Sequence, residues 1–173
     1  MKKYAALFGG SGNNTASKEY IETVKIGSFL ATQGYLVKNG GYGGMMEAVS
    51  IGATTSGGIA IGVTCKQVGT STGNAYLSET IVTEKLYDRL KILIEDTSVF
   101  IVQRGGIGTL SEVFLALDII RKEPKEKQPK LYFIGSVWKN VIDSLKQDLI
   151  PKYEHHLLEI VENVEELEKK WKI

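Results

Sequence analysis

The 173-residue chain lacks most features that mark secreted or membrane-spanning proteins. It has a single cysteine, Cys65, so no disulfide can form within the chain, and this suits a reducing compartment. No apolar run approaches the ~20 residues that a transmembrane helix needs. The apolar run at residues 5–8 is also too short for the core of a signal peptide. We therefore expect a soluble, cytoplasmic protein with no membrane partner.

An excess of charge of one sign is also missing. The chain has 21 Lys and Arg residues against 20 Asp and Glu, a formal net charge of +1. A protein that binds nucleic acid mainly through phosphate contacts usually carries a basic excess or a basic stripe. The one basic cluster, residues 121–130, is interrupted by Glu123 and Glu126 and is interpreted as a solvated loop. No nucleic-acid partner is expected.

Proline is scarce, with three residues, whereas glycine is abundant, with 19. Most of the glycines fall in a few clusters, of which the main three are residues 9–12, 40–44 and 105–108. Each of these clusters follows a short apolar run and precedes a stretch of helical periodicity. Such clusters indicate specialised strand-to-helix turns rather than disorder.

Apolar runs alternate with helical patterns along the whole chain. The predicted strands are residues 4–8, 35–37, 59–63, 99–102, 131–134 and 158–161. The predicted helices are residues 17–33, 45–55, 86–94, 109–121, 137–149 and 164–170, with Thr15 or Ser17 as the first N-cap and Gly34 closing that helix. Residues 64–83 are polar and irregular, and we expect a long loop there. Continuously apolar strands between helices are typical of an α/β fold, a three-layer, doubly wound parallel sheet in a single domain, residues 1–173.

In a parallel sheet, right-handed crossovers place every strand-to-helix turn at the same edge, where ligands bind. The three glycine clusters are therefore expected to form one nucleotide-sized site. The strongest is the turn Gly105-Gly-Ile-Gly-Thr109, because glycine lets backbone N–H groups approach an anion and a helix N-terminus favours negative charge. Hydroxyl groups of Thr109 and Ser111 lie nearby in the sequence. The alternative is that the turn is simply tight.

Three residues allow two interpretations from spacing alone. Thr109 and Glu112 have the spacing of a capping box, yet Glu112 also lies near the ligand edge. Arg89 lies on the helix before the fourth strand, where a lone arginine is usually a surface residue. Cys65 is interpreted as a small buried hydrophobic residue.

Taken together, these residues resemble the LOG family of Rossmann-like proteins, long labelled "possible lysine decarboxylase". The family signature P-G-G-x-G-T-x-x-E appears as residues 104–112, and residues 40–48 resemble its second glycine motif. The arginine of the family motif M-x-x-R-K is present as Arg89, with Leu86 in place of the methionine. Two larger departures, Leu90 for the lysine and Arg104 for the signature proline, bear on substrate choice and activity.

Characterised LOG proteins hydrolyse the N-glycosidic bond of nucleoside 5′-monophosphates, releasing a free base and ribose 5-phosphate. The resemblance implies that residues 1–173 form a nucleotide-binding domain with this activity and with no metal or cofactor. It implies that Glu112 stabilises the ribosyl cation and orients water, and that Arg89 holds the 5′-phosphate or polarises the leaving base. The residues expected to bind the substrate are Gly10, Ser11, Gly44, Met45, Asn74, Gly105, Gly106, Ile107, Gly108 and Thr109.

A non-catalytic binder is the alternative function. Related proteins of the superfamily resemble carriers of molybdenum cofactor or sensors of nucleotide-derived signals. The changes at Leu90 and Arg104 favour this alternative, whereas retention of Arg89 and Glu112 favours the enzyme.

A homodimer is also expected, because LOG-like proteins pair through helices near the active site. The predicted helices at residues 86–94 and 109–121 carry wide apolar faces, wider in the second than one-sided packing on a sheet needs. The face of the second helix consists of Leu110, Val113, Phe114, Leu117 and Ile120. The alternative is that both faces are buried within the domain.

Overall fold

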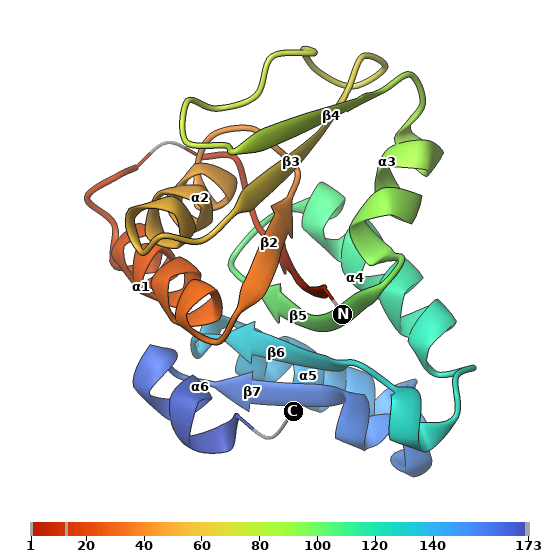
Figure 1. Cartoon of the computed structure of the whole chain (residues 1–173). Helices are drawn as coiled ribbons and strands as arrows, with labels where there is room; N and C mark the ends of the chain where they lie inside the picture. Colours follow the sequence, from red (N-terminus) through yellow and green to blue (C-terminus); the bar gives the residue numbers. More distant parts are fainter. Residues whose placement is uncertain (1, 13, 172–173) are drawn as a thin grey trace.

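The computed structural model describes residues 2–12 and 14–171, which form one α/β domain (Figure 1). The strands are β1 (Lys3–Phe8), β2 (Tyr35–Asn39), β3 (Ala60–Cys65), β4 (Glu79–Thr83), β5 (Thr97–Val102), β6 (Lys130–Ile134) and β7 (Leu158–Val161). The helices are α1 (Lys18–Thr32), α2 (Met45–Thr55), α3 (Leu86–Ile94), α4 (Ile107–Ile120), α5 (Val137–Asp148) and α6 (Val164–Lys170). All neighbouring strands are parallel, in the order β4-β3-β2-β1-β5-β6-β7, so the predicted fold class is confirmed.

The strands are continuously apolar because helices cover both faces of the sheet. Successive residues of β1 point to opposite faces, so Leu7 packs in the core beneath α1, α2 and α6, whereas Phe8 packs in the core beneath α3, α4 and α5. Both side chains are essentially inaccessible to solvent. Strands β1, β5 and β6 each contribute side chains to both cores, which is the physical reason for their unbroken apolar sequences.

The strand order reverses beside β1, and this reversal positions the site. From β1 the chain builds outward through β2, β3 and β4, and β5 then returns to the other side of β1 before β6 and β7 follow. At such a reversal the helices that follow the two central strands leave on opposite faces of the sheet. A crevice is expected at the carboxyl ends of β1 and β5, next to the glycine turns at residues 9–12 and 105–108.

The structure differs from the prediction in one strand and one helix boundary. The expected loop at residues 64–83 contains the strand β4, which was missed because it is largely exposed and polar and pairs only with β3 at the sheet edge. Helix α4 begins at Ile107, two residues earlier than predicted. Elsewhere the predicted elements agree to within two residues, and Ser17 rather than Thr15 is the N-cap of α1.

The structure also bears on three further expectations, about the solvated basic segment, the buried cysteine and membrane-spanning helices. Residues 121–127 are exposed, and Arg121 pairs with Asp118 one turn earlier, as expected for a solvated segment. Cys65 is completely buried at the end of β3. Among the residues that the structure describes, no helix is long and apolar enough to cross a membrane.

Candidate functional site

The three glycine turns meet at the carboxyl edge of the sheet and are hydrogen-bonded to one another. The backbone N–H of Gly10 donates to the carbonyl of Arg104 at 3.0 Å, and the N–H of Met45 donates to the carbonyl of Gly10 at 2.9 Å. Gly44 has a positive φ of 67°, and a Cβ atom added to it would lie 2.5 Å from the Gly10 carbonyl oxygen. Only glycine combines this backbone conformation with such close packing. The turns thus form one continuous backbone surface.

The turn before α4 leaves backbone donors available for an anion. Gly106 is the N-cap of α4 and supplies no side-chain hydrogen bond to the first helical turn, so the N–H groups there have no partner within the helix. A Cβ atom at Gly105 would overlap the hydroxyl of Thr109, which is buried beneath the turn. The hydroxyl of Ser111 donates to the carbonyl of Ile107 at 3.0 Å and is occupied within the helix. If an anion binds at this turn, as predicted, the backbone N–H groups are the donors available to it.

The capping box predicted from Thr109 and Glu112 is wrong. Because α4 begins at Ile107 with Gly106 as its N-cap, Thr109 already lies inside the helix and has no N-cap role. Glu112 lies in the second turn, where its side chain is free to point across the site.

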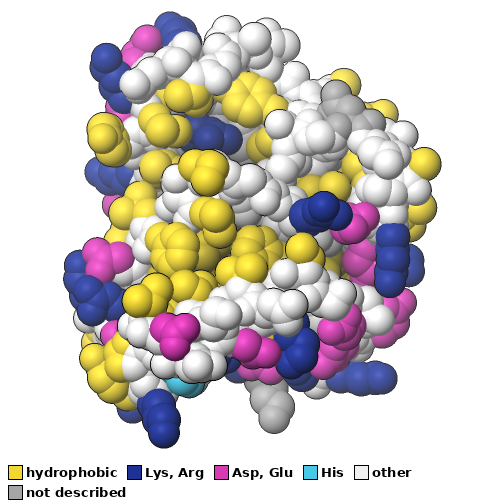
Figure 2. All heavy atoms as spheres, turned by 180° about the vertical axis from the view of Figure 1, so that it is seen from behind, with side chains coloured by type: hydrophobic (Ala, Val, Ile, Leu, Met, Phe, Trp, Pro, Cys, Tyr) yellow, Lys and Arg dark blue, Asp and Glu magenta, His cyan; other side chains and the backbone are white. Residues whose placement is uncertain are grey.

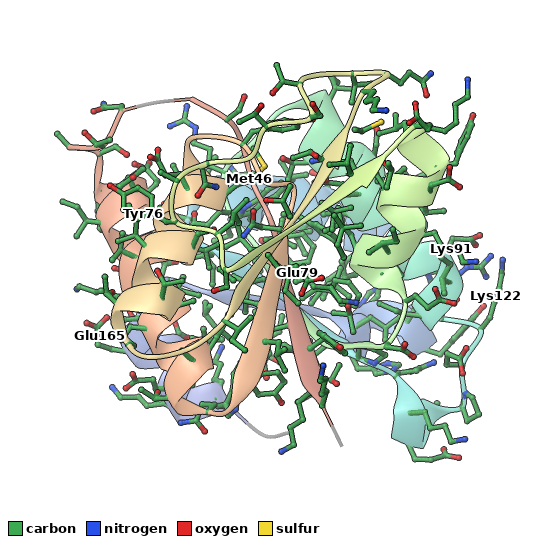
Figure 3. All side chains as sticks on the ribbon, turned by 45° about the horizontal axis from the view of Figure 1, so that its top comes forward. Met46, Tyr76, Glu79, Lys91, Lys122 and Glu165 are labelled. Carbon is green, nitrogen blue, oxygen red and sulfur yellow. The ribbon has the colours of Figure 1, made fainter. Side chains whose placement is uncertain are left out.

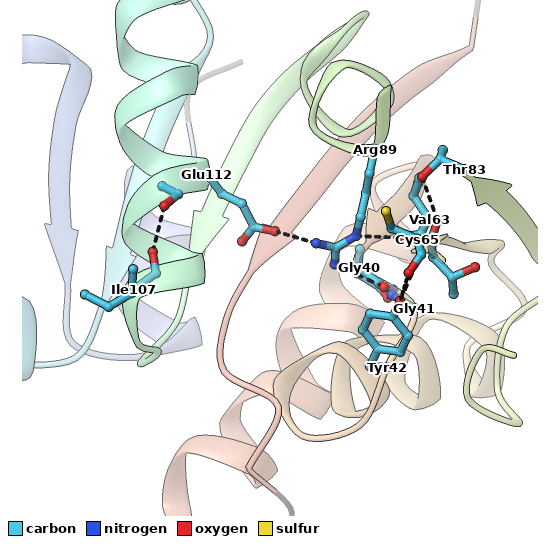
Figure 4. Close-up of polar contacts among 12 residues, drawn as sticks. Gly40, Gly41, Tyr42, Val63, Cys65, Thr83, Arg89, Ile107 and Glu112 are labelled. Atoms are coloured by element: carbon cyan, nitrogen blue, oxygen red, sulfur yellow. Dashed lines mark hydrogen bonds and ion pairs between the residues drawn. The ribbon is translucent and has the colours of Figure 1, made fainter. Parts of the chain in front are cut away.

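Glu112 instead faces Arg89, and both side chains are about nine-tenths buried (Figure 4). The Arg89 Nη1 atom lies 3.7 Å from Glu112 Oε1. Nε of Arg89 donates to the carbonyl of Val63 at 2.7 Å, and Nη2 donates to the carbonyl of Gly40 at 3.2 Å. Arg89 is thus not a surface residue: it joins α3, the end of β3, the second glycine turn and α4.

The pKa of Glu112 is shifted toward neutral pH. Burial raises the pKa of Glu112 from its ordinary value of 4.5 to about 7, although the positive charge of Arg89 opposes the rise. A carboxyl group with a pKa near the working pH can change protonation state during a reaction. Strongly shifted groups of this kind are concentrated at functional sites.

The second glycine turn is held by residues around Arg89. The guanidinium carbon of Arg89 lies 5.5 Å from the centre of the Tyr42 ring, and the Tyr42 hydroxyl contacts the backbone of Cys65 and Thr70. The side-chain amide of Asn74 donates to the carbonyls of Tyr42 and Gly41 at 2.9 and 3.3 Å. Asn74 therefore binds the turn, and a contact with substrate stays a prediction for it. Tyr42 was not singled out from the sequence, although an aromatic residue inside a glycine cluster is an available signal.

The remaining predicted site residues fall into two groups. Gly10, Gly44, Met45, Gly105 and Thr109 lie in the hydrogen-bonded junction of the turns, whereas Ser11, Gly106, Ile107 and Gly108 are exposed at its outer surface. Ile107 has 80% of its surface exposed, so it presents an apolar side chain at the start of α4. The substrate contacts of both groups stay predictions. Among the described residues, no cluster of three or more His, Cys, Asp or Glu side chains is arranged to hold a metal ion.

A comparison with protein families decides the relationship. Residues 2–123, more than half of the chain, match the model of the SLOG cluster4 family. The chain belongs to the SLOG cluster4 family. The resemblance to LOG proteins is thereby confirmed, and the matched region includes Arg89, Glu112 and all three glycine turns.

Individual relatives of this SLOG cluster4 protein are only 30–36% identical to it, over part of its length. An uncharacterised protein of Archaeoglobus fulgidus is 30% identical over 105 residues, which cover 61% of this chain and 68% of the relative. The cytokinin riboside 5′-monophosphate phosphoribohydrolase of Mycobacterium tuberculosis is 36% identical over 92 residues, or 52% of this chain. The matched part spans about half, 49%, of that relative's length.

Among solved structures, the fold is similar to the molybdenum cofactor binding protein of Rippkaea orientalis. The TM-score is 0.74 at 25% identity, and the match covers 98% of this chain and 95% of the other. The molybdenum cofactor carrier protein of Chlamydomonas reinhardtii gives a TM-score of 0.75 at 23% identity, over 98% of this chain and 95% of that one, and shows the shared fold.

The approach of Arg89 to the second turn of this SLOG cluster4 protein requires a glycine at position 40. A Cβ atom there would overlap Nη2 of Arg89 and lie 2.7 Å from the sulfur of Met46, which lies near the middle of the carboxyl edge (Figure 3). Gly40→Ala is therefore expected to push Arg89 away from Glu112 and to raise the pKa of Glu112 further, because the opposing positive charge retreats.

Carbon-13 NMR titration of the Glu112 carboxyl group measures this change. Arg89→Met gives the upper limit of the rise, since it removes the charge altogether. Any base-releasing activity should fall by about 10²-fold in Gly40→Ala, as expected when a catalytic group is misplaced by about 1 Å. An unchanged pKa in Gly40→Ala would contradict the clamping role of Gly40.

Proposed function

We propose that this protein hydrolyses the N-glycosidic bond of a nucleoside 5′-monophosphate, producing a free base and ribose 5-phosphate. The observation that carries the proposal is the buried Arg89–Glu112 pair, on helices that flank the phosphate-binding edge. The phosphoribohydrolase named for the Mycobacterium tuberculosis relative supports the same reaction. We place the activity in the cytoplasm, since the lone buried cysteine suits a reducing compartment.

Each part of the site has a distinct task in this reaction. The N–H groups of the α4 turn hold the 5′-phosphate. As the glycosidic bond breaks, its electron pair leaves with the base and C1′ becomes cationic. Water then adds to C1′, and the proton that the water loses passes to the departing base, which is released as the neutral free base. The ionised carboxylate of Glu112 stabilises the positive charge at the ribose and orients the water. The proposed reaction uses no metal ion or cofactor.

Arg89 is assigned as a positioning residue in this scheme. Nε and Nη2 donate to backbone carbonyls and Nη1 faces Glu112, so the guanidinium is committed to the protein on three sides. Of the two roles implied by the family resemblance, neither phosphate binding nor polarisation of the base fits this arrangement as well as holding Glu112.

The experiment that tests the function is incubation with a panel of nucleoside 5′-monophosphates, followed by chromatography for free base and ribose 5-phosphate. Release of base from at least one member, and not from the matching nucleoside, supports the proposal. Binding of a monophosphate without release of base over the whole panel would contradict hydrolysis.

The second candidate is a carrier or sensor that binds a nucleotide or molybdenum cofactor without cleaving it. The observation that favours it is the similarity over nearly the full chain to the molybdenum cofactor binding protein of Rippkaea orientalis. Native mass spectrometry of the purified protein separates the two candidates, because a carrier retains its ligand intact whereas a hydrolase releases its products.

We further infer that two copies of the chain associate through the outer face of α4. The structure buries Val113, Leu117 and Ile120 of the predicted apolar face within the domain. Phe114 stays 45% exposed, and it is joined by Leu115 and Ile119, which the sequence pattern had not included. Figure 2, which views the side of the molecule that carries α4, shows hydrophobic side chains gathered over this face. The apolar face of α3 is mostly buried in the domain, with Leu90, Leu93 and Ile94 all at most 8% exposed, whereas that of α4 is only partly buried. A second copy would cover the exposed remainder of α4.

Introducing a charge at the centre of this face is expected to separate the two copies. Phe114→Asp should reduce the mass measured by light scattering to that of one 19.0 kDa chain, and it should weaken activity because the interface lies close to the site. Ile59→Asp is the matched control, since Ile59 is similarly exposed, at 44%, but lies just before β3 and outside α4. A wild-type mass near 19.0 kDa at micromolar concentration would rule out the dimer.

A further inference from the structure

A cavity lies beside the glycine turn that precedes α4, on the side of the sheet that carries α1. Its volume is about 420 Å³, and it is lined by Gly10, Gly12, Ser17, Glu19, Met45 and Arg104, among others. A Cβ atom on Gly105 would lie only 2.9 Å from the backbone nitrogen of Gly10. Gly10 and Arg104 both line the cavity, and the N–H of Gly10 donates to the carbonyl of Arg104, the residue just before Gly105. The cavity therefore borders the start of the α4 turn, at the point where the strand order reverses.

Of the described residues that line this cavity, Arg104 is the only basic one, and its backbone is tightly held. Its carbonyl accepts from Gly10 at 3.0 Å, and its N–H donates to Oε1 of Gln103 at 3.2 Å. These two hydrogen bonds fix the backbone of Arg104, one residue before Gly105. The guanidinium thus projects from the base of the phosphate turn into a region where the LOG signature has a proline with no charge.

The guanidinium itself is weakly held. Its nearest acidic partner among the described residues is Glu19, with Nη1 3.8 Å from Oε1, beyond normal hydrogen-bond distance. The two side chains are 67% and 41% exposed, and ion pairs this exposed contribute little to stability. An anion that enters the cavity can therefore replace Glu19 as the partner of Arg104 with little loss of free energy. A guanidinium group binds a phosphate group through two parallel hydrogen bonds.

We propose that Arg104 forms a second anion subsite, which makes the protein select nucleoside 5′-diphosphates over monophosphates. The inner phosphate lies on the α4 turn, and the outer phosphate extends into the cavity and replaces Glu19 as the partner of Arg104. The proposal rests on the phosphate-binding role of the turn in the proposed function and goes beyond that function, because it concerns how tightly a diphosphate binds compared with a monophosphate and not which nucleotide is cleaved. Bond cleavage is not required for it.

Calorimetry with AMP and ADP tests this selection in the intact protein. ADP is expected to bind about tenfold more tightly than AMP, the amount that one charge-assisted contact supplies. Arg104→Ala should remove this difference, whereas Arg104→Lys, which keeps the charge but not the bidentate geometry, should retain part of it. Glu19→Gln should tighten ADP binding, because the competing carboxylate is lost. High salt should shrink all of these differences.

Three outcomes would overturn the subsite: equal affinities for AMP and ADP, equal losses for both in Arg104→Ala, or no gain for ADP in Glu19→Gln. Inorganic phosphate and pyrophosphate serve as a second pair of probes that needs no base or ribose. Pyrophosphate affinity that is insensitive to Arg104→Ala would also overturn it. By contrast, an Arg104-dependent preference for ADP, together with no release of base from any monophosphate of the panel, would reject the hydrolase and leave the subsite intact.

Discussion

Glu112→Gln is expected to reduce base release from AMP by at least about 100-fold while leaving the fold intact. Removing a preorganised group that stabilises charge in a transition state typically costs this much. Glutamine has the same shape but no negative charge to place beside the ribosyl cation. The rate is measured by chromatography of the free base, with circular dichroism as the check on folding. Full activity in a correctly folded Glu112→Gln protein would reject Glu112 as the catalytic carboxylate.

The stability of the same variant distinguishes a site residue from a structural one. Glu112 makes no capping hydrogen bond, so its replacement removes no helix cap. Because burial raises its pKa to about 7, the folded state favours the neutral carboxyl group. The wild-type protein therefore loses stability as the pH rises from 4.5 to about 7, and Glu112→Gln should lack this loss. Urea unfolding at pH 5 and pH 8 measures the difference.

The pH dependence of catalysis should follow the same group in the opposite sense. The reaction uses the ionised carboxylate, so base release by the wild-type protein should increase as the pH rises through about 7. The residual activity of Glu112→Gln should show no such rise. A wild-type profile that is flat between pH 5.5 and 8.5, a range chosen as about 1.5 units on each side of this pKa, would contradict the assignment.

The parallel sheet was predictable because its signal is local. Continuously apolar runs such as those of β1 and β5 report burial on both faces, and glycine clusters report the turns between strands and helices. The exception, β4 (Glu79–Thr83), lies at the sheet edge, is largely exposed and has polar residues at both ends. Only its pairing with β3 makes it a strand, and that pairing is not visible in its own sequence.

The candidate site was less predictable because its contacts are not local. The burial of Arg89 depends on acceptors at Val63 and Gly40 and on Glu112, which come from three segments far apart in the chain. The spacing of Thr109 and Glu112 favoured a capping box. In the structure Gly106 is the N-cap and the helix begins earlier, so Glu112 has no capping role. The resemblance to LOG proteins implied that Arg89 and Glu112 work together, and the structure places their side chains 3.7 Å apart. The resemblance could not show which backbone groups hold the arginine, and the catalytic role of the pair stays a prediction.

Gly106→Val is expected to abolish AMP binding without unfolding the protein. A Cβ atom at this position would meet nothing within 4 Å, and the residue has an extended backbone, with φ −105° and ψ −150°. A β-branched side chain adopts this conformation readily, so the folded chain accommodates valine. The branched side chain would then occupy the space in which a phosphate must approach the N–H groups at the start of α4.

The neighbouring glycine provides the contrast that gives this test its meaning. Gly105→Val should destabilise the fold itself, because its Cβ would overlap the Thr109 hydroxyl and press against the backbone of Gly10. Thermal unfolding should therefore distinguish the two variants, with only Gly106→Val matching the wild type. Calorimetry with AMP and adenosine completes the comparison: the wild type should bind adenosine far more weakly than AMP, and Gly106→Val should lose the advantage of the phosphate. Undiminished AMP affinity in a folded Gly106→Val protein would show that the phosphate does not lie on this turn.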